Sequence, residues 1–272
     1  MTQTSTDADS VPELTPEILE YYARGGERRR LYEGSGRLEL WRTQDILRRI
    51  LPEPRGRLLD IGGGTGVHAE WLAADGWSVD LIDPVPSHVE AAITLPGVTA
   101  RHGDARALAD GDATADVALL LGPLYHLPDP DDRRRALMEA ARVVRPGGTV
   151  VAATINRHAA LHDQLKRGGW FEPERRARLE ATSASGRAYA GGEFTTAYLH
   201  RPAEIAAELG AAGLTVTGQY SVEGAVWLMA DVAGYLDDEV RRAGVLAALR
   251  ITESDPSLLG VAGHLLTAAR RD

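Results

Sequence analysis

Residues Leu58–Asp83 read LLDIGGGTGVHAEWLAADGWSVDLID, and this stretch decides the fold. A short apolar run breaks into glycines, continues as an amphipathic segment, and returns to a second apolar run that stops at Asp83. Short apolar runs bounded by turn residues are typical of buried strands, and the segment between them has the length of a helix. The stretch therefore predicts a strand, a helix and a second strand, with glycines at the first turn.

The glycines of this turn predict a ligand site, because glycine permits positive φ and lets a ligand approach the backbone without a Cβ in the way. Gly62, Gly64 and Gly66 alternate, and Val67 stands where the dinucleotide fingerprint G-x-G-x-x-G has its third glycine. A Walker phosphate loop is excluded because no lysine follows the glycines. Asp83 is placed to accept hydrogen bonds from both hydroxyls of an adenosine ribose, a role that nicotinamide and adenosyl-sulfonium cofactors share. Both cofactor classes remain open at this point.

The same alternation of apolar runs and amphipathic segments continues outward from this stretch. Strands are predicted at 57–61, 78–83, 98–103, 115–121 and 148–155, with helices at 67–74, 87–94 and 130–144. Strands that alternate with helices predict an α/β fold with a doubly wound parallel sheet, in which ligands lie beyond the carboxyl ends of the strands.

The chain outside this alternation divides into three further parts. Residues 1–13 are polar and predicted to be a disordered tail, and residues 14–54 are predicted to form a helical N-terminal cap. Residues 156–200 offer helix pieces and glycines without a strand, so we expect an insertion over the site. The pattern then resumes with a helix at 202–209, a strand at 214–222, a helical stretch at 231–249 and a last strand at 264–269, which completes a main domain over 55–272.

Composition excludes several classes of function. Acidic residues outnumber basic ones, 39 to 30, and the net charge of -9 offers no broad attraction to nucleic acid or to an anionic membrane. The chain has no cysteine, which removes disulfides, thiolate metal sites and cysteine nucleophiles. No apolar run approaches the roughly 18 residues of a membrane span, and the polar start lacks a signal-peptide core. We expect a cytoplasmic protein, a monomer or homodimer, with no metal site.

Five motifs in order resemble those of the class I S-adenosylmethionine-dependent methyltransferases. LLDIGGGTG at 58–66 is similar to their first motif, Asp83 to their ribose-binding acid, and HGDARAL at 102–108 to the segment that flanks the adenine. ADVALLLGPLYHL at 115–127 resembles their fourth strand and its loop, and ARVVRPGGTVV at 141–151 the turn entering the fifth strand. The resemblance implies a Rossmann-like seven-stranded sheet with an antiparallel last strand, and S-adenosylmethionine as the cofactor.

The resemblance also implies a role for each matching residue. The methionine part of the cofactor would border Asp60, Gly62, Gly63, Gly64 and Gly66. The ribose would lie at Asp83, beside Pro84, and the adenine at Asp104 and Ala105. The sulfonium side would face Leu121 and Gly122.

Several residues outside the motifs are candidates for chemistry or for closing the pocket. His126 is the candidate general base, because it follows the fourth strand and a neutral imidazole accepts a proton near physiological pH. Tyr125 is placed to orient the acceptor, and His200 is a second candidate base. In the N-terminal cap, Arg42 is a candidate partner of the methionine carboxylate and Tyr22 a cation–π partner of the sulfonium.

The absence of two sequence features indicates that the acceptor is a small molecule. GPLY at 122–125 differs from the Asn/Asp-Pro-Pro-aromatic motif typical of methyltransferases acting on amide or exocyclic nitrogens of protein and nucleic acid. The absence of cysteine excludes methylation of pyrimidine C5 by the usual thiolate route. We therefore expect methyl transfer to a small molecule of secondary metabolism. Two alternatives stay open: an NAD(P)-dependent oxidoreductase, and a non-catalytic S-adenosylmethionine-binding regulatory protein.

Overall fold

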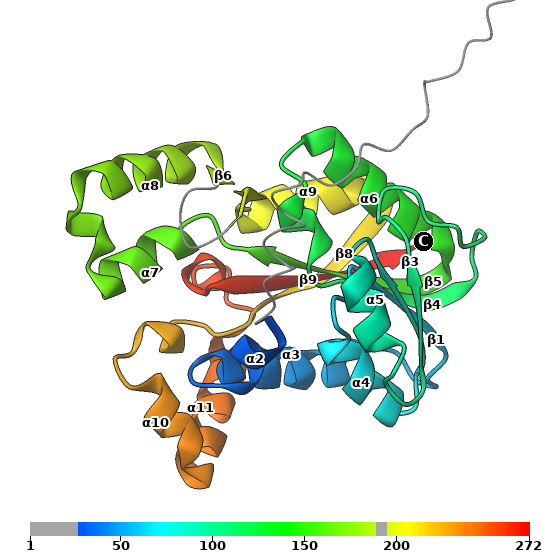
Figure 1. Cartoon of the computed structure of the whole chain (residues 1–272), viewed down its shortest axis with the longest axis horizontal. Helices are drawn as coiled ribbons and strands as arrows, with labels where there is room; N and C mark the ends of the chain where they lie inside the picture. The colour runs from blue at the N-terminus through cyan, green and yellow to red at the C-terminus, as the bar shows by residue number, and fades with distance from the viewer. Residues whose placement is uncertain (1–26, 189–194) are drawn as a thin grey trace, which may run out of the picture.

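The computed structural model describes residues 27–188 and 195–272, and its centre is a seven-stranded sheet (Figure 1). The strand order is β3-β2-β1-β4-β5-β9-β8. The strands of this sheet are β1 Arg57–Ile61, β2 Ser78–Asp83, β3 Val98–His102, β4 Ala115–Leu120, β5 Val144–Ile155, β8 Leu214–Ser221 and β9 His264–Arg271. Neighbours from β3 to β5 pair in parallel, whereas β9 runs antiparallel to both β5 and β8. This confirms the Rossmann-like, doubly wound sheet and its antiparallel last strand.

Helices cover both faces of the sheet. The helices are α2 Glu27–Tyr32, α3 Gly36–Ile50, α4 Val67–Ala74, α5 Pro86–Ala92, α6 Pro130–Val143, α7 Ala159–Arg167, α8 Pro173–Ser185, α9 Pro202–Ala211, α10 Val232–Asp237 and α11 Glu239–Thr252. Helices α6 and α9 pack buried side chains such as Leu137 and Ile205 on one face. Helices α3, α4 and α5 cover the other face through residues such as Leu47, Leu72 and Ala92. Two apolar layers therefore enclose the strands, which is why the strands read as continuous apolar runs.

The structure corrects three sequence-based boundaries. Strand β5 begins at Val144, not at 148, because Val144 pairs with Ala115 before the register shifts and Thr149 pairs with Val117. The 156–200 region, for which we predicted no strand, contains the two-residue strands β6 Arg187–Ala188 and β7 Ala197–Tyr198, which pair with each other. The helical stretch at 231–249 divides into α10 and α11, because Asp238 caps a new helix through the Arg241 N–H.

The carboxyl ends of the parallel strands meet at one edge of the sheet, where two helical pairs also lie. Figure 1 shows α7 and α8 beyond the end of β5, and α10 and α11 beyond the end of β8. Strand β9 starts at this edge because it runs antiparallel, so its first residue, His264, pairs with the last residue of β5, Ile155. Among the described helices, none has the length and apolar character needed to cross a bilayer.

Candidate active site

The turn between β1 and α4 brings bare backbone to the carboxyl edge of the sheet. Gly62 and Gly64 have φ of +71° and +57°, in the left-handed region that favours glycine. A Cβ on Gly62 would lie 2.9 Å from Pro123 Cδ, whereas the nearest atom to a Cβ on Gly64 is His88 Nδ1 at 4.0 Å. Packing therefore requires a glycine at 62, and at 64 the missing side chain leaves the cavity beside it open.

A cavity beside this turn is lined by most of the residues that we predicted from the sequence to bind the cofactor and the acceptor. It is lined by Asp60, Gly62, Gly63, Gly64, Asp83, Pro84, Asp104, Ala105, Leu121, Gly122, Tyr125 and His126, together with residues that the sequence did not single out. The lining comes from the ends of β1, β2 and β4 and the segment after β3, which the sheet order places side by side. The sequence motifs thus lie around one cavity because each stands at the carboxyl end of a strand of the same sheet.

Asp83 is held in place by three neighbours. Its Oδ2 accepts from the Gly64 N–H at 2.8 Å, and its Oδ1 accepts from the Val85 N–H at 2.9 Å. The Oδ1 also lies 3.0 Å from His88 Nδ1. The carboxylate is therefore oriented before any ligand arrives, and it joins the glycine turn to the end of β2.

Asp60 is a buried carboxylate with an unusual environment. Its side chain is 1% exposed, and neither oxygen has a hydrogen-bond partner among residues 27–188 and 195–272. Burial, together with the nearby charge of Asp83, raises the pKa of Asp60 to about 7. An unpartnered buried carboxylate is costly unless a ligand supplies the missing donors. Asp60 therefore suits a cationic hydrogen-bond donor in the cavity.

Asp104 is fixed by the arginine two residues further along the chain. Asp104 Oδ1 accepts from the backbone N–H and Nε of Arg106, and its Oδ2 accepts from Nη2 at 2.7 Å. Arg106 also reaches Asp132 at the start of α6 with Nη1 at 2.9 Å. The segment after β3 is thereby locked against α6, with Asp104 on the cavity wall.

Tyr125 and His126 form the wall after β4. Their rings meet edge to face, with centroids 4.6 Å apart. His126 is 7% exposed, and burial lowers its pKa to about 4. Its imidazole is therefore neutral at physiological pH, but a pKa so far below 7 makes it a weak proton acceptor. The structure places His126 at the site, and its role as base stays a prediction.

Arg42 does not reach this cavity, which corrects the expectation that it pairs with the methionine carboxylate. Its side chain is fully buried on α3, where Nη1 donates to Asp45 at 2.6 Å and Nη2 donates to Glu253 at 2.5 Å. Its Nε donates to the Val222 carbonyl at 3.0 Å. The guanidinium is thus occupied by carboxylates that the sequence places 3 and 211 residues away.

His200 and Gly66 also lie outside the cavity lining. His200 is fully buried and its Nε2 lies 3.3 Å from Glu208, so its imidazole belongs to the packing of α9 and not to the site. Gly66 caps α4 with φ of +84°, and a Cβ there would meet Leu95 Cδ1 at 2.4 Å. Its role is close packing of the helix. Tyr22 lies outside the described residues, as does the 1–13 tail.

Three titratable residues of the cavity were not predicted from the sequence: Glu39, His68 and His88. His88 carried a local signal, because Pro86 begins α5 and places His88 in its first turn, close to Asp83. His68 follows the glycines directly on α4, and its Nδ1 accepts from Trp71 Nε1 at 3.3 Å. Glu39 carried no signal, because only packing of α3 against the sheet brings it to the cavity.

Several known proteins are similar to this chain in sequence. Residues 35–219 match a family described as methyltransferase domain. An uncharacterized methyltransferase of Mycobacterium bovis is 37% identical over 100 residues, which are 36% of this chain and 40% of the relative. The ubiquinone biosynthesis O-methyltransferase of Azorhizobium caulinodans is 28% identical over 207 residues, 71% of this chain and 66% of the relative. These matches therefore span from about two fifths to just under two thirds of the relatives' lengths.

A solved structure supports the fold over most of the chain. The crystal structure of a SAM-dependent methyltransferase from Methanosarcina mazei aligns with a TM-score of 0.57 at 20% identity, covering 83% of this chain and 96% of that one.

Proposed function

The chain belongs to the methyltransferase-domain family of S-adenosylmethionine-dependent enzymes, and we propose that it transfers a methyl group from S-adenosylmethionine to a small molecule. The observation that carries this proposal is Asp60. A buried carboxylate without a donor, between a glycine turn and the ribose-type acid Asp83, fits the α-ammonium of the methionine moiety.

The other lining residues complete the fit to the cofactor. We assign the ribose hydroxyls to the Asp83 carboxylate, the adenine to Asp104 and Ala105, and the methionine backbone to the open face at Gly64. Leu121 and Gly122, at the end of β4, would lie beside the sulfonium. Each assignment matches a residue that already lines the cavity.

The protein's contribution to the chemistry is chiefly position. When bound, S-adenosylmethionine supplies an electrophilic methyl group on a sulfonium. Leu121 and Leu127 give the cavity an apolar wall that would exclude water, while Tyr125 and His126 shape the space where an acceptor would meet the methyl group. Holding two reactants in a productive geometry accounts for roughly 7–11 kcal/mol of barrier lowering in well-oriented systems.

A small molecule of secondary metabolism, with oxygen as the methylated atom, is the acceptor that we propose. The acidic charge of the chain and the GPLY sequence after β4 count against nucleic acid. The match to a ubiquinone biosynthesis O-methyltransferase supports an oxygen acceptor. A cytoplasmic location and a monomeric or homodimeric state remain part of the proposal.

Ligand-induced stabilisation tests the cofactor. We expect S-adenosylmethionine and S-adenosylhomocysteine to raise the melting temperature in a concentration-dependent way, and NADH and NADPH to leave it unchanged. Transfer of labelled methyl from S-adenosylmethionine to a panel of small phenols then tests the reaction. Stabilisation by a nicotinamide cofactor alone would contradict the proposal.

A further inference from the structure

The methionine end of S-adenosylmethionine carries an α-carboxylate on the same carbon atom as its α-ammonium. If Asp60 receives the ammonium, the carboxylate must lie close by and needs its own hydrogen-bond donor. Arg42 does not supply one, because its guanidinium is held by Asp45 and Glu253. Among the described residues that line the cavity, none is an arginine or a lysine. Within this part of the chain, the donor is therefore of another type.

One side of the cavity is formed by three helices. This helical wall consists of Leu31 from α2, Glu39 from α3, and Val67 and His68 from α4. Leu31 and Val67 belong to one buried apolar cluster with Leu40 of α3, which joins the three helices. Within the helical wall, His68 is the one side chain that can donate a hydrogen bond, because Glu39 is ionised with a pKa lowered to about 2.

The glycine turn leads directly from Asp60 to His68. A Cβ on Gly63 would lie 2.6 Å from Asp60 Oδ2, so the carboxylate lies against the turn. Gly66 caps α4, and His68 is the second residue of that helix. The first N–H groups of a helix lack intrahelical partners and favour a negatively charged group. The start of α4 thus suits the α-carboxylate of a ligand whose ammonium lies at Asp60.

Trp71 fixes the tautomer of His68. Its indole Nε1 donates to His68 Nδ1 at 3.3 Å, and the two rings meet edge to face with centroids 6.4 Å apart. An indole nitrogen only donates, so the accepting Nδ1 carries no proton and the ring proton lies on Nε2. Burial outweighs the opposing charge of Glu39 and lowers the pKa of His68 to about 4. The ring is therefore neutral at physiological pH and keeps one N–H, at Nε2.

This Nε2–H is the polar group that His68 can offer to a ligand. Among residues 27–188 and 195–272, none forms a hydrogen bond with Nε2, and the side chain lines the cavity. A hydrogen bond from a neutral imidazole to a carboxylate is charge-assisted, and it is stronger than a bond between two neutral groups.

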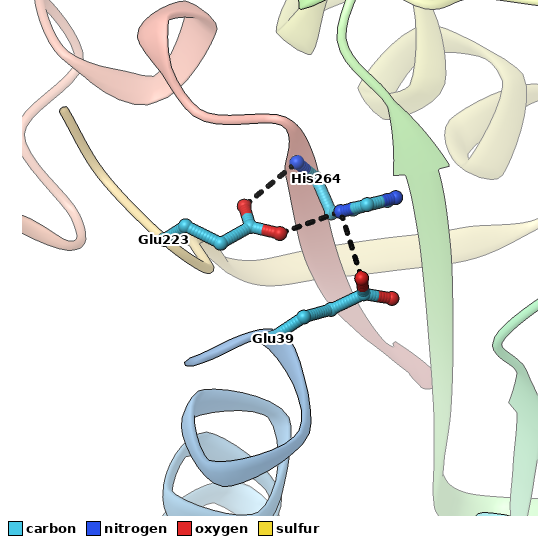
Figure 2. A group of neighbouring side chains, drawn as sticks. All are labelled: Glu39, Glu223 and His264. Atoms are coloured by element: carbon cyan, nitrogen blue, oxygen red, sulfur yellow. Dashed lines mark hydrogen bonds and ion pairs between the residues drawn. The ribbon is translucent and has the colours of Figure 1, made fainter. Parts of the chain in front are cut away.

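Two positive side chains beside the helical wall are already paired. Arg30 donates to Glu39 with Nη1 at 2.5 Å and Nη2 at 3.1 Å. Figure 2 shows His264 with its Nδ1 2.6 Å from Glu223 Oε1 and 3.8 Å from Glu39 Oε2. Burial would lower the pKa of His264, but Glu39 and Glu223 outweigh it and raise the pKa to about 9. Two positive and two negative charges therefore balance, and the ionised Glu39 does not oppose a carboxylate at His68.

We propose that His68 Nε2 donates a hydrogen bond to the α-carboxylate of S-adenosylmethionine, and that Trp71 is the positioning residue that holds the ring in this tautomer. The inference rests on the proposed function. It gives the two charged groups of the methionine moiety separate partners, with the ammonium at Asp60 and the carboxylate at His68. His68 thus takes the role that the sequence suggested for Arg42.

The test compares two ligands that differ in one group. S-adenosylhomocysteine carries both the ammonium and the carboxylate, whereas its decarboxylated analogue keeps the ammonium alone. Titration calorimetry of the full-length protein measures both affinities at pH 8, where Asp60 is largely ionised. If the wild type binds neither ligand, the proposed function itself is contradicted. The effect of His68 is then read from the difference between the two ligands.

We expect His68→Ala to weaken binding of S-adenosylhomocysteine by about tenfold or more, the loss typical of a hydrogen bond to a charged group, and to leave the analogue unaffected. His68→Gln keeps a side-chain donor and should restore part of the affinity. Trp71→Phe keeps an aromatic ring without the donor and should weaken S-adenosylhomocysteine alone. Asp60→Asn should weaken both ligands, because both carry the ammonium.

His158→Ala is the matched control for loss of an imidazole, because His158 lies at the start of α7, outside the cavity lining, and it should bind both ligands like the wild type. The proposal is overturned if His68→Ala binds S-adenosylhomocysteine as the wild type does, or if it weakens both ligands equally. A carboxylate-selective loss in Thr65→Val alone would also overturn it, in favour of the Thr65 hydroxyl in the glycine turn.

Discussion

The Gly64 N–H donates to Asp83 Oδ2 at 2.8 Å, which ties the glycine turn after β1 to the acid at the end of β2. One carboxylate therefore shapes the turn and also offers its remaining lone pairs to a ligand. This double role means that a change at Asp83 affects both the local backbone and the cofactor.

Replacing Asp83 by alanine is expected to weaken binding of S-adenosylhomocysteine by about ten- to a hundredfold, the loss expected for hydrogen bonds to a charged group. Titration calorimetry measures the affinity, and Asp83→Asn is the control that keeps an acceptor for the Gly64 N–H. An unchanged affinity in Asp83→Ala would place the ribose elsewhere.

Asp60 should make cofactor affinity depend on pH. Its pKa is raised from 3.8 to about 7 in the protein without ligand, so a proton must leave before the carboxylate can receive an ammonium group. Affinity for S-adenosylhomocysteine should therefore rise as pH increases through about 7 and level off above it. Asp60→Asn should bind weakly and without this dependence, and a pH-independent wild type would contradict the assignment.

The raised pKa of Asp60 also predicts how the stability of the protein without ligand depends on pH. Below pH 3.8 Asp60 is protonated in both the folded and the unfolded chain, so its ionisation does not change the free energy of unfolding. Between that pH and about 7 the folded state holds the extra proton, so stability falls as pH rises, by up to roughly 4 kcal/mol. Asp60→Asn should therefore melt at a higher temperature than wild type at pH 8, and at a similar temperature at pH 4.

Gly64 and Gly66 form a matched pair of substitutions to alanine. Both have positive φ, so each alanine should cost about 1–2 kcal/mol of unfolding free energy in urea titrations. Gly66→Ala must also displace Leu95, whereas only Gly64→Ala places a methyl group at the cavity wall. We expect Gly64→Ala alone to lose affinity for S-adenosylhomocysteine; equal losses in both variants would contradict the separation of their roles.

Replacing Arg42 by alanine should lower stability by about 1.5–3 kcal/mol, because it removes buried hydrogen bonds to two carboxylates. The loss stays moderate because Arg49 still pairs with Asp45 and Glu253. Affinity for S-adenosylhomocysteine should not change at a temperature where the variant is folded, since Arg42 does not line the cavity. If the variant is stable but binds S-adenosylhomocysteine more weakly, Arg42 contributes to the cofactor site.

Much of the site could be predicted because its residues stand at or just after the carboxyl ends of strands. The apolar runs that become β1, β2 and β4 appear directly in the sequence, and parallel strands bring the residues after them to one edge. Asp60, Asp83, Asp104 and His126 line one cavity for this reason. Arg42 and His200 were misplaced because an amphipathic helix or a short strand shows which residues are polar, not which partner each one meets.

The sequence by itself determined the strand and helix order, the glycine turn and the acids at the strand ends, because local periodicity and turn chemistry act over a few residues. Tertiary structure alone decided which polar residues meet across long separations. Glu39, Glu223 and His264 come from α3, the segment after β8 and the start of β9. Their approach depends on α3 packing against the sheet and on β9 running antiparallel, which places His264 at the carboxyl edge of the parallel strands and not at the opposite edge.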